Sequence, residues 1–92
     1  MAQVVLTLKI MPNSPSSDLA KIEDSARKEI EHFAGKTEMR STIEPIAFGL
    51  KAIKIIFVMN ESKGSTESLE NKISSVKDVS SVEVVDVRRA IG

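Results

Sequence analysis

The sequence LKAIKIIFVM, residues 50–59, decides the fold that we expect for this chain. Branched and aromatic side chains dominate it, and these side chains favour β-strands. A large apolar residue stands at every second position, which predicts one fully apolar strand face; these residues are Ile53, Ile55, Phe57 and Met59. Because Ile56 and Val58 add apolar side chains to the opposite face, we expect this strand in the interior of a sheet.

Toward the C-terminus, a polar turn at residues 60–64 leads into a second helix and a last strand. Ser65 or Thr66 is placed to cap the helix, and Glu67 suits the positive end of the helix dipole. The buried stripe of this helix is predicted from the spacing of Leu69, Ile73 and Val76. Residues 80–88 are then expected to form the last strand, which is rich in the β-branched residues Val82, Val84, Val85 and Val87.

Toward the N-terminus, a weaker strand is expected at residues 37–44, and Pro45 places it at an edge or a strand end. A helix precedes it, with Ser17 or Asp18 as its N-cap and Gly35 just past its end. Its apolar stripe has helical spacing and consists of Leu19, Ile22, Ala26, Ile30 and Phe33. The first strand is expected at residues 4–10, where apolar residues alternate before the break at Pro12.

The resulting order is β-α-β-β-α-β, which predicts an α+β fold of the ferredoxin-like, split βαβ class. Right-handed crossovers place both helices on one face of a four-stranded antiparallel sheet. The first and third strands are then central, and the more charged second and fourth strands lie at the edges. The other sheet face is left open, either to solvent or to a bound partner, and it carries Val5, Thr7, Lys9, Lys54, Ile56 and Val58.

Length and composition predict one domain, residues 1–92, in an ordinary soluble protein. Thirteen basic and thirteen acidic residues balance, which argues against direct nucleic-acid binding because that function needs a basic surface. The chain has no cysteine, so disulfides and thiolate chemistry are excluded. The apolar N-terminal stretch is too short to cross a bilayer and lacks the features of a signal peptide, so we expect a cytoplasmic protein without membrane contact.

The sequence offers no recognisable centre for catalysis, a cofactor or a metal. The four glycines form neither a dinucleotide-binding motif nor a P-loop. His32 is the only histidine, and its place late in the first predicted helix favours a surface position. No spacing of histidine and acidic residues resembles a metal site. We therefore expect a protein that is not an enzyme.

Two other classes of function fit the predicted fold, because ferredoxin-like domains serve many roles. A small-molecule-binding regulatory domain would act as a dimer and leave little local signature. An RNA-recognition domain would carry stacking aromatic residues on its central strands. The only aromatic residue there is Phe57, and its position in the strand points it toward the helices.

The segment EPIAFGLK, residues 44–51, resembles the start of the third strand in the elongation factor 1-beta family. The family pattern there is Pro-Ile, a small residue, Phe-Gly and an aliphatic residue before the apolar strand. Residues 4–12, 64–67 and 82–89 are also similar to the family, so the resemblance covers nearly the whole chain. The short length resembles the archaeal branch, whose members are bare exchange domains.

The resemblance implies a guanine nucleotide exchange factor that binds the GTPase elongation factor 1A and disturbs its Mg²⁺ and phosphate site. Its contact residues would be Pro45, Ile46, Phe48, Gly49 and Lys51. Pro45 restricts the backbone, Gly49 permits unusual conformations, and a phenylalanine between them is suited to anchor a partner. The alternative is that Phe48 packs into the core beside Ile46 or Leu50. We expect the free chain to be a monomer.

The resemblance is imperfect at the C-terminus. Eukaryotic members carry a lysine there that is thought to intrude on the Mg²⁺ site, whereas this sequence continues from Asp86 to Ala90-Ile91-Gly92 without one. Arg88 and Arg89 are the nearest cations. A planar guanidinium is not equivalent to an ammonium group, so these arginines are expected either to take over the role or to be solvated charges of an edge strand.

Overall fold

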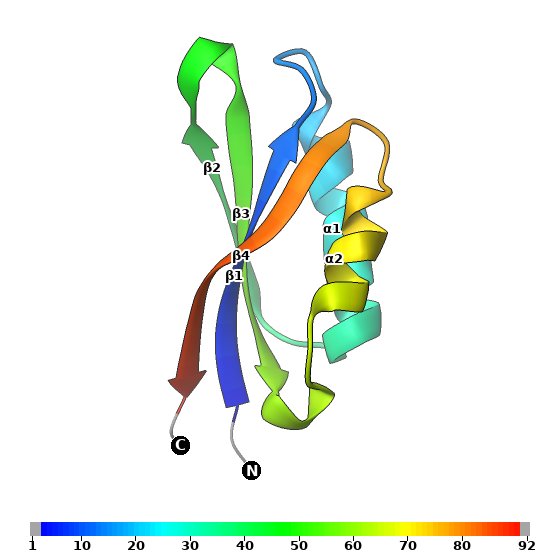
Figure 1. Ribbon diagram of the computed structural model, residues 1–92, viewed down its shortest axis with the longest axis vertical. Helices are drawn as coiled ribbons and strands as arrows, with labels where there is room; N and C mark the ends of the chain where they lie inside the picture. Colours follow the sequence, from blue (N-terminus) through cyan, green and yellow to red (C-terminus); the bar gives the residue numbers. More distant parts are fainter. Residues whose placement is uncertain (1–2, 91–92) are drawn as a thin grey trace.

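The computed structural model describes residues 3–90, in which two helices cover one face of an antiparallel sheet (Figure 1). The elements in chain order are β1 (Gln3–Pro12), α1 (Leu19–Ala34), β2 (Met39–Pro45), β3 (Lys51–Asn60), α2 (Glu67–Ser74) and β4 (Val79–Ala90). The strand order across the sheet is β2-β3-β1-β4. The ferredoxin-like α+β fold, with β1 and β3 central and β2 and β4 at the edges, is therefore confirmed.

Both helices begin at N-cap residues that the sequence predicted. Asp18 is the N-cap of α1, and its Oδ1 accepts a hydrogen bond from the Lys21 backbone N–H at 3.2 Å. At α2 the N-cap is Thr66, whose hydroxyl donates to the Glu70 carboxylate at 2.9 Å instead of accepting from the backbone. Ser65 supplies the missing acceptor, because its Oγ accepts from the Glu67 N–H at 3.1 Å.

One predicted helix residue lies outside its helix. Because α2 ends at Ser74, Val76 falls in the turn that follows, where its N–H donates to the Ile73 carbonyl at 3.0 Å. The prediction that Val76 continues the helical stripe is wrong for this reason. Its side chain is still half-buried in the turn.

The core lies between the sheet and the helices, as the periodicity predicts. Alternate residues of β1 and β3 point toward the helices and are paired across the sheet, as in Leu6 opposite Phe57 and Leu8 opposite Ile55. The helices cover them with the buried residues Ile22, Ala26, Ile30, Leu69 and Ile73. The opposite sheet face has no helix over it and carries the predicted pairs, including Thr7 beside Ile56 and Lys9 beside Lys54.

The molecule is elongated, with principal extents of 42 × 21 × 18 Å. Figure 1 shows the β2–β3 connection at one end of its long axis, beside the β1–α1 connection. The start of β1, the end of β3 and the end of β4 lie together at the other end. The described residues stop at Ala90, so Ile91 and Gly92, which belong to the divergent C-terminal stretch, lie outside them.

Candidate functional site

The β2–β3 connection is a tight hairpin built from the segment that carried the family resemblance. Pro45 and Lys51 are the last paired residues of the two strands. Beyond them, the Ile46 N–H donates to the Leu50 carbonyl at 2.7 Å, and the Leu50 N–H donates to the Ala47 carbonyl at 3.2 Å. Phe48 and Gly49 are therefore the two central residues of a β-turn at one end of the molecule.

Both central residues of this turn have left-handed backbone angles. The φ and ψ of Phe48 are 62° and 29°, and the φ of Gly49 is 76°. Positive φ at both positions defines a type I′ turn, which matches the twist of the strands and favours Asn-Gly. Glycine accepts this geometry freely, but a bulky residue such as phenylalanine is strained in it.

The Phe48 side chain projects into solvent and is 95% exposed. The alternative in which Phe48 packs into the core is therefore wrong, because the left-handed turn carries its side chain away from the sheet. The apolar neighbours Ile46 and Leu50 are half-buried instead. A strained and exposed aromatic residue on a short hairpin is a candidate binding feature, since its conformation costs stability without burying apolar surface.

The remaining predicted hairpin residues support this feature. Pro45 and Lys51 are exposed at the ends of their strands. Gly49 faces the β1–α1 connection, where a Cβ placed on it would lie 3.8 Å from the Pro15 Cβ. That distance is ordinary van der Waals contact, so glycine is required here by its φ and not by a lack of space.

The two C-terminal arginines lie on opposite faces of β4. Arg88 is paired with Val5 on the open sheet face, and its Nε donates to the Asp86 carboxylate at 3.0 Å. Arg89 is on the helix side and forms a bidentate pair with Glu61, with Nη2 2.6 Å and Nε 3.3 Å from the carboxylate oxygens. Both cations are thus paired within the free chain.

The arginines and Phe48 lie at opposite ends of the sheet. Arg88 and Val58 both lie opposite Val5, so Arg88 stands level with Val58, seven residues along β3 from Lys51. At about 3.3 Å per residue this separates the two features by at least about 23 Å. The structure therefore does not bring the predicted contact residues into one cluster.

Within residues 3–90, two side chains have clearly shifted pKa values, and the largest cause of each shift is one ion pair. The pKa of Glu44 is lowered because Lys54, 2.7 Å away on the open sheet face, donates a hydrogen bond to its carboxylate. The pKa of Arg89 is raised because its guanidinium donates hydrogen bonds to Glu61. Glu44 is half-buried and Arg89 is exposed, so both pairs are open to solvent and fix side-chain geometry more than they stabilise the fold.

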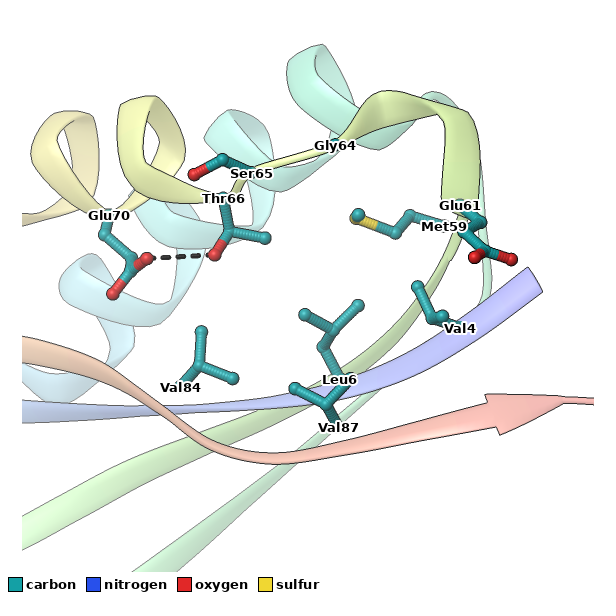
Figure 2. A pocket seen from close by; sticks show the side chains of 10 residues that line it. All are labelled: Val4, Leu6, Met59, Glu61, Gly64, Ser65, Thr66, Glu70, Val84 and Val87. Carbon is teal, nitrogen blue, oxygen red and sulfur yellow. Dashed lines mark hydrogen bonds between the residues drawn. The ribbon is translucent and has the colours of Figure 1, made fainter. Parts of the chain in front are cut away.

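Sequence reasoning missed an apolar groove between the sheet and the start of α2 (Figure 2). It has a volume of about 410 Å³, and it is lined by Val4, Leu6, Met59, Glu61, Gly64, Ser65, Thr66, Glu70, Val84 and Val87. The groove exists because the eight residues of α2 span about 12 Å, whereas the twelve residues of β4 span about 40 Å. A comparison of the lengths that the sequence predicts for these two elements could have revealed the groove.

Within residues 3–90, no group of three or more histidine and acidic side chains is arranged to hold a metal ion. His32 is exposed in the last turn of α1. None of the helices in this part of the chain has the length and apolar character needed to cross a bilayer.

Comparison with known proteins gives consistent results over nearly the whole chain. The model of a family described as the EF-1 guanine nucleotide exchange domain matches residues 5–90. Elongation factor 1-beta of Methanobrevibacter smithii is 42% identical over 89 residues, covering 97% of this chain and 98% of that protein. Elongation factor 1-beta of Methanothermobacter thermautotrophicus is 43% identical over 91 residues, with the same coverage of both chains.

A solved structure shares the fold alone. The de novo designed protein Foldit4 aligns over 98% of both chains with a TM-score of 0.64 and 15% sequence identity. At that identity the likeness supports the arrangement of strands and helices and carries no information on function.

Proposed function

The chain belongs to the EF-1 guanine nucleotide exchange domain family and has a guanine nucleotide exchange role in translation elongation, and on this premise we propose that it loosens GDP on elongation factor 1A. It acts in the cytoplasm as a monomer when free, and it works by binding alone, without bond chemistry. The observation that carries this proposal is Phe48, which the hairpin holds in a strained, 95% exposed position.

Phe48 serves as the anchor at one end of the molecule. Binding hot spots are enriched in aromatic side chains that fill a pocket of the partner, and an anchor that is rigid before binding loses less entropy on binding. The Ile46–Leu50 backbone hydrogen bond of 2.7 Å closes the hairpin behind Phe48, and the φ of 62° limits its backbone freedom. Burying the ring on elongation factor 1A therefore costs little additional ordering.

The arginines form the second contact, at the other end of the sheet. Because Phe48 and Arg88 are at least about 23 Å apart, one small pocket of the partner cannot receive both. The chain therefore spans its partner, with Phe48 holding one region while Arg88 or Arg89 approaches the Mg²⁺ and phosphate site. Arg89 must first leave the Glu61 carboxylate, 2.6 Å away, to do so.

Exchange by binding follows from thermodynamic coupling between the two ligands of the GTPase. If the chain weakens the binding of GDP to elongation factor 1A, then GDP weakens the binding of the chain to elongation factor 1A by the same ratio. A thousandfold faster release needs about 4 kcal/mol off the barrier. A few anchors in an interface of standard size can supply this.

This reciprocity is the test of the proposal. The dissociation constant of the chain from nucleotide-free and from GDP-bound elongation factor 1A would be measured by calorimetry. GDP should weaken the binding of the chain to elongation factor 1A by a certain factor. In a parallel titration, the chain should weaken the binding of GDP by the same factor. Equal affinity for both forms of the GTPase would show that the chain binds without weakening the binding of GDP, and it would overturn the coupling mechanism.

A further inference from the structure

The apolar groove beside β4, hereafter the β4 groove, leaves a large apolar side chain uncovered on the helix side of the sheet. Val87 is 59% exposed there, although its neighbours Leu6 and Met59 are buried. Figure 2 shows Val87 and Leu6 pointing from the sheet toward the Gly64–Thr66 segment, and the Met59 side chain lies between Leu6 and that segment. The groove therefore has an apolar floor that extends to the molecular surface.

The rim of the β4 groove is acidic. Glu61 and Glu70 line it, and no lysine or arginine is among the described residues that do. Arg89 neutralises Glu61 from outside the groove. The Glu70 carboxylate forms no ion pair within residues 3–90 and accepts a hydrogen bond from the Thr66 hydroxyl at 2.9 Å. A complementary occupant has an apolar side chain next to a lysine or arginine.

The groove is continuous with the contact proposed for Arg89. Val87 and Arg89 are two positions apart on the same face of β4 and lie opposite Leu6 and Val4 of β1. Side chains so placed are separated by about 7 Å, so a surface that reaches the Arg89 guanidinium also lies over Val87. When Arg89 turns toward an anion of that surface, the Glu61 carboxylate becomes free to accept another cation.

We propose that the β4 groove is a docking surface for a basic, apolar segment of elongation factor 1A. An apolar side chain of that segment covers Val87, and an adjacent lysine or arginine takes the place of Arg89 on Glu61. This inference rests on the proposed exchange function and adds a docking point to it, separate from the hairpin at the other end.

The test compares two exposed valines of the same strand. Val87→Gln places an amide in the groove, while Val85→Gln is the matched control at a bulge outside it, where Thr7 pairs with Asp86 and Leu8 with Val84. Release of fluorescent GDP from elongation factor 1A is measured against the concentration of each variant. Thermal unfolding should be nearly unchanged in both, since Val87 and Val85 are 59% and 44% exposed.

Val87→Gln should raise the concentration needed for half-maximal release roughly tenfold, which corresponds to about 1.4 kcal/mol, and Val85→Gln should leave it unchanged. Release curves for Val87→Gln that match those of the wild type, or an equal loss of activity in both variants, would overturn the groove proposal. Neither outcome would contradict the exchange function. No acceleration by the wild-type chain would instead refute the exchange function. A wild-type dimer that Val87→Gln dissociates would assign the groove to a second copy and overturn the proposal.

Discussion

Replacing Phe48 by asparagine should make the protein more stable and less active at once. A non-glycine residue in the left-handed region costs roughly 1–2 kcal/mol, and asparagine tolerates this region better than most residues. Since Phe48 is 95% exposed, its removal forfeits little buried apolar surface. Phe48→Asn should therefore stabilise the fold by about 1 kcal/mol, which raises the melting temperature by roughly 4–8 °C.

The same substitution removes the proposed anchor. A hot-spot aromatic residue contributes about 2 kcal/mol or more to an interface, so GDP release at subsaturating Phe48→Asn should be about 30-fold slower. Thermal unfolding by circular dichroism and the release of fluorescent GDP measure the two effects separately. Phe48→Tyr is the control, since it keeps the aromatic ring and should retain most of the activity.

Two outcomes would contradict this reasoning. A parallel loss of stability and exchange in Phe48→Asn would mean that the ring supports the fold. A stabilised Phe48→Asn variant with wild-type exchange would mean that the exposed ring is not the anchor.

Three further predictions concern the hairpin, the arginines and one carboxylate. Gly49→Ala should lower the unfolding free energy by roughly 1–2 kcal/mol because of the φ of 76°, and chemical denaturation would detect it. The double substitution Arg88→Ala and Arg89→Ala should slow GDP release about tenfold. Since the two arginines lie on opposite faces of β4, one of the two single substitutions should account for the loss. Unchanged GDP release in the double variant would contradict the proposed role of the arginines. Glu44 has a pKa below its ordinary 4.5 because of Lys54, so its contribution to stability is full above pH 4.5 and disappears as the pH falls through the lowered pKa. The difference in melting temperature between wild type and Glu44→Gln should therefore vanish in acid, and a difference that persists at about pH 2 would contradict the assignment.

The fold followed from the sequence because its main signals are local and periodic. The alternation of apolar residues from Ile53 to Met59 identifies a central strand, whatever its pairing register with the neighbouring strands. The spacing from Ile22 to Ile30 identifies a buried helix face. Val76 was misplaced because apolar spacing persists past the turn that ends α2. Helix ends depend on backbone hydrogen bonds, which the pattern of apolar residues does not report.

The candidate site was less predictable for a different reason. The exposure of Phe48 depends on a type I′ turn, whose usual Asn-Gly signal is absent because phenylalanine occupies the first central position. The β4 groove depends on the unequal lengths of α2 and β4, and the residues that line it come from elements as far apart in the sequence as β1 and β4. By contrast, the opposite orientations of Arg88 and Arg89 follow from strand alternation alone and could have been predicted.

The most direct test of the central claim is the rate of GDP release from purified elongation factor 1A with and without this chain. Elongation factor 1A loaded with fluorescent GDP would be mixed with excess unlabelled GDP and increasing amounts of the wild-type chain. The release rate should rise with the concentration of the chain and saturate, as expected for a complex that forms before GDP leaves. A release rate that does not depend on the chain at any concentration would contradict the account.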